Sequence, residues 1–240
     1  MSQSLLFFYF EGIPNKRNMV SVKAGQFSIT PSVSEKLLGC NLQQSLKWNS
    51  HLGLHMKSLS TRINGIRKIS YNSSFRTKLM VANGVYMSKL VYLMAVWGGA
   101  QKYLLNSLQV QQLAVARLVC GFNSRMWSRQ KILSKVGWLS VHQLVVYNTV
   151  LQAQKAISTG HPESLVSSIS TEHPYMTRSA TEGHIRYGES FRHDSALGAS
   201  SFRHRAVRWY NLVPSSVRTG TLVTVKKKLR NWIWQNVPIG

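Results

Sequence analysis

Most of the side chains in this sequence that could do chemistry are cations. The 240 residues contain 30 Lys and Arg against 7 Asp and Glu, which gives a formal net charge of +23 at pH 7. A chain with this imbalance repels itself when it is compact, so we expect it to work against a polyanion that neutralises it. Nucleic acid is the leading candidate, and an anionic membrane surface could act in the same way. No apolar run of the sequence approaches the roughly 18 residues of a membrane-spanning helix.

The carboxylates are too scattered to support metal-dependent phosphoryl chemistry. The acidic residues are Glu11, Glu35, Glu163, Glu172, Glu182, Glu189 and Asp194. None lies between Lys36 and Pro162. Nucleotidyl transfer and two-metal phosphodiester hydrolysis need clustered carboxylates, because anionic oxygens hold the pair of Mg²⁺ ions about 4 Å apart. The middle of the chain cannot assemble such a cluster, and we expect no metal and no other cofactor.

Cysteine, histidine and serine offer no stronger site. Cys40 and Cys120 lack a nearby Cys or His at zinc-ligand spacing, and the histidines of 161–204 lie about ten residues apart, which is not a local ligand spacing. The sequence has neither a G-x-x-x-x-G-K-[ST] phosphate loop nor a G-x-S-x-G elbow. We predict two core cysteines, with a single disulfide as the alternative. The expected compartment is reducing and intracellular, nucleus or cytoplasm, without secretion.

The first 48 residues are predicted to form short β-strands. Ser4–Gly12 and Met19–Ile29 are rich in β-favouring residues and are punctuated by Gly and Pro, which is typical of a hairpin. The apolar run Leu5–Phe10 is too short for a signal peptide and lacks a basic segment before it, so we interpret it as a strand. Glu35–Cys40 is one more short apolar piece. We assign 1–48 to a β-rich segment.

Beyond Asn49 the apolar period changes from two to about 3.6, which predicts helices. The first helix carries its buried stripe on Leu52, Met56, Leu59, Ile63 and Ile66. Further helices are expected at 73–96, 104–119, 130–136 and 140–157, the last of them capped by Ser140. Together they predict a helical bundle over 49–160.

The rest of the chain predicts a linker and two closing helices. Residues 161–200 are rich in Ser, Thr, His and Gly and lack helical periodicity, so we expect an irregular loop. Helices are expected at 202–212 and 222–235 within a C-terminal segment over 201–240. The predicted fold class is therefore mainly α, with a short N-terminal β portion, a helical bundle, a linker and two C-terminal helices.

Cations on the predicted helices are the candidate nucleic-acid contacts. A basic side chain with no acid to pair with can neutralise a backbone phosphate, and its alternative is a solvated outer face. The candidates are Lys57, Arg62, Arg67, Lys68, Arg76, Lys78, Arg125, Arg129, Lys131, Lys226, Lys227, Lys228 and Arg230. Interleaved aromatics such as Phe75, Trp127 and Trp209 could stack on unpaired bases, although we expect most aromatics in the core.

A series of short motifs follows one order between residues 36 and 233. They are Lys36-Leu-Leu-Gly39-Cys40, Trp48-Asn-Ser-His51, Ser88-Lys-Leu-Val-Tyr92, Val96-Trp97-Gly98, Leu108-Gln-Val-Gln111, Ala116-Arg117-Leu118, Trp138-Leu139-Ser-Val141, Thr177-Arg178-Ser179 and Trp209-Tyr-Asn211-Leu-Val-Pro214. In this order they resemble the region that follows the palm in reverse transcriptases of non-LTR, LINE-type retrotransposons. One departure is Tyr210, which splits the Trp-Asn pair of the family.

The resemblance implies a thumb and C-terminal extension, which in this family hold template and primer by their backbones, preceded by the edge of the palm over 1–48. The family's catalytic aspartates would lie upstream of Met1, so the chain alone is expected to be inactive as an RNA-directed DNA polymerase. We therefore expect a non-catalytic module that binds RNA or an RNA/DNA duplex and no membrane. The alternatives are a piece of an active reverse transcriptase with its palm encoded upstream, and a structural ribonucleoprotein subunit.

Overall fold

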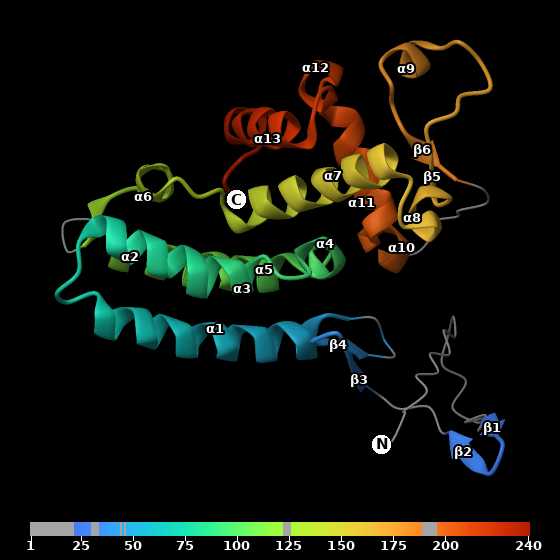
Figure 1. Ribbon diagram of the computed structural model, residues 1–240. Helices are drawn as coiled ribbons and strands as arrows, with labels where there is room; N and C mark the ends of the chain where they lie inside the picture. Colours follow the sequence, from blue (N-terminus) through green and yellow to red (C-terminus); the bar gives the residue numbers. More distant parts are fainter. Residues whose placement is uncertain (1–21, 30–33, 44, 46, 122–125, 189–195) are drawn as a thin grey trace. The chain divides into compact units, whose positions relative to one another are not determined.

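The computed structural model describes residues 22–29, 34–43, 45, 47–121, 126–188 and 196–240, and these residues are mainly helical with short antiparallel strands near the N-terminus (Figure 1). This confirms the predicted fold class. The chain divides into two compact units, Met1–His55 and Met56–Gly240. The predicted strand at Leu5–Phe10 lies outside the described residues.

The first unit contains two β-hairpins. Their strands are β1 (Val22–Ala24), β2 (Phe27–Ile29), β3 (Ser34–Leu37) and β4 (Cys40–Gln43). Both pairs are antiparallel, with Val22 opposite Ile29 and Leu37 opposite Cys40. The β3–β4 turn consists of Leu38 and Gly39, whose φ values of 48° and 80° are those of a two-residue hairpin turn with positive φ at both positions. The apolar piece predicted at Glu35–Cys40 is therefore a hairpin, because Gly39 permits the reversal.

The second unit contains most of the helices. After α1 (Asn49–Ile69) come α2 (Phe75–Val81), the π-helical segment η1 (Ala82–Met87), α3 (Ser88–Leu90), α4 (Met94–Trp97), α5 (Lys102–Cys120), α6 (Arg129–Val136) and α7 (Val141–Thr159). The predicted stripe of α1 is buried at Leu52, Leu59, Ile63 and Ile66, and Met56 is half-buried.

The run predicted as one helix at 73–96 is interrupted. It passes through π-helical geometry at η1 and then breaks at Leu93, whose φ of 54° is left-handed and cannot continue a right-handed helix. The carbonyl of Tyr92, released by this break, accepts a hydrogen bond of 2.8 Å from Trp97 Nε1. The periodicity of the segment predicted its buried face but not its change of direction, because a single left-handed residue leaves no periodic pattern.

The C-terminal third contains more local structure than a loop followed by two helices. Its elements are α8 (Glu163–Val166), β5 (Ile169–Ser170), α9 (Arg178–Thr181), β6 (Arg186–Tyr187), α10 (Ala196–Ser200), α11 (Phe202–Leu212), α12 (Ser215–Arg218) and α13 (Leu222–Asn236). The helices predicted at 202–212 and 222–235 are confirmed. Within 161–200, where we expected an irregular loop, β5 and β6 pair with Ile169 opposite Tyr187.

Helix α7 lies at the centre of this unit and packs against α4, α5, α11 and α13 (Figure 1). Its predicted cap is confirmed: Ser140 and Gln143 form a capping box. The side-chain amide of Gln143 also donates to the carbonyl of Val237 at 2.7 Å, which ties the start of α7 to the end of α13. The amide N–H of Val141 donates to Gln109 of α5. The first turn of α7 therefore fixes two neighbouring helices.

The junction of α4, α7, α10 and α11 is held by Arg205. This buried side chain donates to the carbonyls of Ala95 at 2.7 Å and Ser200 at 3.2 Å, to that of Val96, and to Thr149 Oγ1. Burial lowers the pKa of Arg205 to about 10, so the guanidinium is charged at neutral pH. Its charge has no carboxylate partner among the described residues and is balanced by these four acceptors.

Gly99 is required at this junction, and replacing it with alanine should destabilise the protein. A Cβ atom there would lie 1.9 Å from the carbonyl oxygen of Ser200, so the backbone would have to move. We expect Gly99→Ala to lower the free energy of unfolding by about 1–3 kcal/mol. Gly65→Ala is the matched control, because a Cβ atom at Gly65 of α1 meets nothing within 4 Å and should stabilise the helix by about 0.5–1 kcal/mol. Urea titration of both variants measures this, and equal effects would contradict it.

Candidate nucleic-acid interface

Side-chain contacts join α2 and α13 to the C-terminal end of α6. Lys135 of α6 places its Nζ 5.7 Å from the centre of the Phe75 ring at the start of α2, and Arg230 of α13 donates to the carbonyl of Gly137 at the end of α6. Within α6 and the turn before it, Lys131 Nζ lies 4.8 Å from the centre of the Trp127 ring. These contacts define what we call the α2–α6–α13 surface. We assign to it six exposed cations of these helices: Arg76, Lys131, Lys135, Lys226, Lys227 and Arg230. Arg129 and Lys228 are also exposed on these helices, but their side chains donate to the carbonyls of Gly240 and Ser216.

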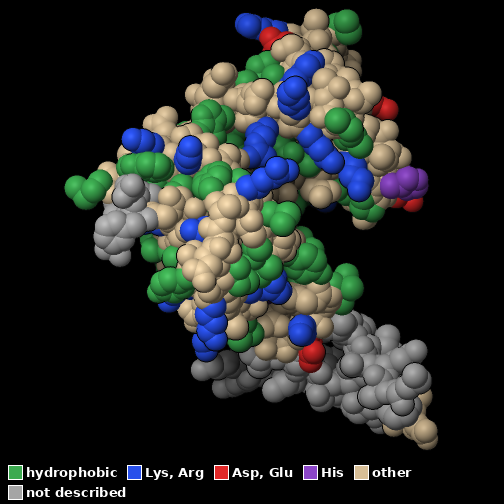
Figure 2. All heavy atoms as spheres, turned by 60° about the vertical axis from the view of Figure 1, so that its left-hand side comes forward, with side chains coloured by type: hydrophobic (Ala, Val, Ile, Leu, Met, Phe, Trp, Pro, Cys, Tyr) green, Lys and Arg blue, Asp and Glu red, His purple; other side chains and the backbone are tan. Residues whose placement is uncertain are grey.

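The charge of this surface is not neutralised within the chain. Among the described residues, the ion pairs join Glu182 to Arg178 at 2.9 Å and to His184 at 3.2 Å, and neither involves the surface. The sequence from Lys36 to Pro162 carries sixteen Lys and Arg and no acid. Figure 2 shows one face of the molecule, on which Lys and Arg side chains are numerous and acidic side chains are few. Such a surface attracts polyanions.

The predicted cations of α1 form a second group. Lys57, Arg67 and Lys68 are exposed, and Arg67 is 3.4 Å from the side-chain oxygen of Asn64. Arg62 is half-buried instead, and its guanidinium donates to the carbonyl of Val85 in η1 at 2.9 Å. Arg62 therefore holds α1 against η1, so a charge reversal at this position would test packing as well as binding.

Two more of the predicted cations, one on α6 and one on α13, also bond to carbonyls. Arg129 donates to Gly240 at 3.2 Å, and Lys228 donates to Ser216 at 2.9 Å. Lys78 is half-buried on α2. Arg125 lies outside the described residues. The clearest exposed cations of the α2–α6–α13 surface are therefore Arg76, Lys131, Lys226 and Lys227, whose side chains make no hydrogen bond to a described residue.

Lys135 is the member of the surface that sequence reasoning missed. It lies four residues after Lys131, so the two side chains share one face of α6. This four-residue spacing is the signal in the sequence that could have identified Lys135. The position of Phe75 beneath its ammonium group depends on the packing of α2 and could not be read from the sequence.

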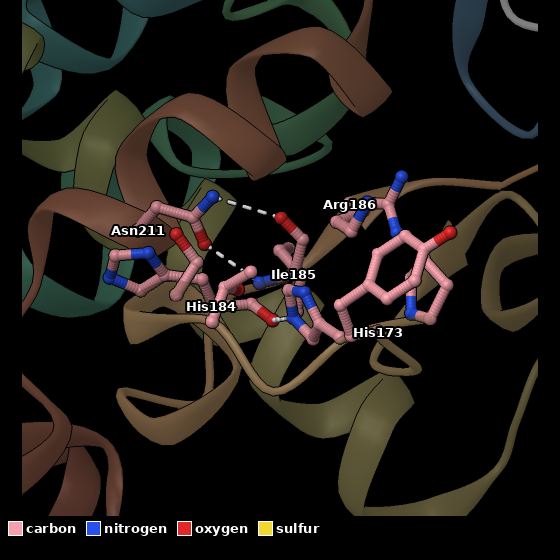
Figure 3. Close-up of a pocket in the computed structure, with 9 residues that line it drawn as sticks. His173, His184, Ile185, Arg186 and Asn211 are labelled. Carbon is pink, nitrogen blue, oxygen red and sulfur yellow. Dashed lines mark hydrogen bonds between the residues drawn. The ribbon is translucent and has the colours of Figure 1, made fainter.

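A separate pocket of about 390 Å³ opens beside β6 (Figure 3). Asn211 of α11 lies at one side of it, where its side-chain oxygen accepts from Ile185 N–H at 2.8 Å and its amide donates to the Ile185 carbonyl at 2.9 Å. His173 Nε2 donates to the carbonyl of His184 at 2.8 Å. The sequence predicted a loop here and gave no signal of a pocket, because its walls come from segments more than twenty residues apart.

The thiols and imidazoles build no metal centre in the part of the chain that the structure describes. Cys40 is buried and Cys120 is half-buried, and the two thiols are not bonded to each other. Burial raises the pKa of both thiols, which keeps them protonated at neutral pH and makes them poor nucleophiles.

No family model, curated protein or solved structure matches this chain. Among the described helices, none combines the length and the apolar character needed to cross a bilayer.

Proposed function

We propose that this chain is a non-catalytic nucleic-acid-binding module that grips backbone phosphates with the α2–α6–α13 surface. The observation that carries the proposal is the gathering of exposed cations from three helices on a surface with no ion pair to a described carboxylate. Lys and Arg that neutralise phosphates release condensed counterions, which makes binding favourable at low salt. The expected ligand is RNA or an RNA/DNA duplex.

Binding of this kind would be indifferent to base sequence. Phosphate contacts fix the position of a protein on a nucleic acid without reading its bases. Two of the cations, Lys131 and Lys135, lie over aromatic rings, so part of the entropy of ordering their side chains is already lost before the ligand arrives. The surface is thus partly preorganised for a polyanion.

The motifs that resemble non-LTR reverse transcriptases support a scaffold role for the same residues. Trp97 and Trp138 are buried, and the indole of Trp138 donates to Asn83 Oδ1 at 2.8 Å. Asn211, which follows the inserted Tyr210, bonds to the backbone of Ile185 at both its oxygen and its nitrogen. A thumb-like fold would need such residues, namely buried aromatics and side chains that bond to the backbone. The resemblance therefore favours a module that holds template and primer.

A salt series tests the proposal. The full chain is titrated against a labelled RNA/DNA duplex by filter binding or anisotropy between about 50 and 200 mM salt. If each of the six surface cations neutralises one phosphate, the plot of log K against log salt should have a slope of about −5. Duplexes of unrelated sequence should bind equally. Affinity that does not depend on salt, or no binding at low salt, would overturn the proposal.

A further inference from the structure

We propose that the pocket beside β6 holds an unpaired nucleotide of the bound strand, an inference that rests on the proposed function. The cavity of about 390 Å³ falls within the range of roughly 300–1,000 Å³ typical of ligand sites. Its lining combines an aromatic ring, a cation and several neutral polar groups. The residues available to a ligand are His173, Tyr175, Thr177, Ser179, His184 and Arg186. The lining itself contains no carboxylate, and Glu182, whose carboxylate lies 3.2 Å from His184 of the lining, is also paired with Arg178 at 2.9 Å.

Arg186 supplies the charge. Its backbone is held in the short β5–β6 pair opposite Ser170, while its side chain is exposed and has no ionic partner among the described residues. Figure 3 shows Arg186 on the side of the pocket away from Asn211. A guanidinium in this position can bind a phosphate through two N–H donors at once.

Tyr175 supplies a stacking surface. Its side chain is 77% exposed, and the backbone at this position is shaped by Pro174 before it and by a hydrogen bond of 2.9 Å from Thr177 N–H to the Tyr175 carbonyl. An aromatic ring that is exposed at a pocket and lies in the same lining as an arginine matches the pattern by which proteins bind unpaired bases.

Neutral polar groups complete the lining. The Nε2 atom of His173 donates to the His184 carbonyl, which leaves the other ring nitrogen, Nδ1, for a ligand. The hydroxyl of Ser179 has no partner among the described residues and can both donate and accept. Donors and acceptors of this kind are what the edge of a base requires.

The walls of the pocket are held in place before any ligand binds. Asn211 bonds to both backbone groups of Ile185, and Arg218 donates to the carbonyls of Glu182 and Gly183 while its guanidinium lies 4.4 Å from the centre of the Tyr210 ring. These contacts join the 182–185 loop to α11 and α12. A preformed pocket loses less entropy on binding than one that must close around its ligand.

The test compares two ligands that share one RNA/DNA duplex. The first is blunt, and the second carries a single-stranded RNA overhang. We expect Tyr175→Ala to lower the affinity for the overhang ligand about tenfold without changing the salt slope, because stacking is not ionic. Arg186→Gln should lower the same affinity and reduce the slope by about 0.7, the value for one phosphate of a single strand. Both variants should bind the blunt duplex as the unmodified protein does.

Tyr103→Ala is the matched control, since Tyr103 is an exposed tyrosine of α5 outside this pocket, and its affinity for both ligands should be unchanged. Unchanged overhang binding by both pocket variants, with duplex binding intact, would overturn this inference and leave the proposed function standing. Equal losses on both ligands would also overturn it. If the unmodified protein binds neither ligand at low salt, the proposed function fails and the pocket assignment fails with it.

Discussion

Replacing Arg205 with methionine should lower the free energy of unfolding by about 2–4 kcal/mol, because several hydrogen bonds from a charged group are lost, each of which contributes about 1.5–3 kcal/mol. The side chain is 8% exposed and bonds to acceptors on α4, α7 and α10. Methionine fills a similar volume but donates no hydrogen bond to the Ala95 carbonyl or to the buried hydroxyl of Thr149, and losing hydrogen bonds in a buried junction is costly. Urea unfolding followed by circular dichroism measures the change in midpoint.

Arg208→Met is the matched control for this variant. Arg208 lies one turn later on the same helix α11 and is exposed, with its guanidinium 5.4 Å from the centre of the Trp209 ring. We expect its replacement to change the free energy of unfolding by no more than about 0.5 kcal/mol. If Arg205→Met were as stable as Arg208→Met, Arg205 would not hold the junction of α4, α7, α10 and α11.

Reversing one charge on each helix of the α2–α6–α13 surface should weaken nucleic-acid binding about 100-fold at low salt. The variant combines Arg76→Glu, Lys131→Glu and Lys227→Glu, three exposed residues whose side chains make no hydrogen bond to a described carbonyl. Losing three phosphate contacts should also make the salt slope shallower by about 3. The loss should be the same for RNA/DNA duplexes of unrelated sequence, because phosphates carry no base information.

A second triple variant separates the effect of total charge from the effect of where the charges lie. Lys102→Glu, Lys155→Glu and Arg208→Glu make the same change in total charge at exposed sites of the same unit that are not part of the surface. We expect this control to lose less than about tenfold in affinity, since exposed charges that make no direct phosphate contact are largely screened by salt. Equal losses in the two triple variants would show that total charge, and not the α2–α6–α13 surface, determines binding.

Much of the helical architecture could be predicted from local sequence. The 3.6-residue period located α5, α11 and α13 within a few residues, and Ser140 predicted the cap of α7. These features depend on residues that are neighbours in the chain, so they are visible without a fold. The β3–β4 hairpin, the break at Leu93 and the β5–β6 pair were missed, because a left-handed residue and a two-residue strand leave almost no periodic pattern.

The candidate site was less predictable than the fold. The sequence identified a basic chain and named most of the exposed cations of the surface. It could not distinguish Arg62, which donates to the Val85 carbonyl, from Lys57, an exposed residue five positions earlier on the same helix. Both are cations on one helix without an acid nearby. Only the position of η1 against α1 makes one of them a structural residue.

The sequence by itself determined the charge of this protein, the stretch from Lys36 to Pro162 without a carboxylate, and the helices that carry the cations. These are properties of composition and of neighbouring residues. The tertiary structure decided that α2, α6 and α13 share one basic surface, and that a pocket forms beside β6. The physical reason is that both depend on contacts between segments far apart in the chain, such as Arg230 with Gly137 and Asn211 with Ile185, whose partners no local pattern specifies.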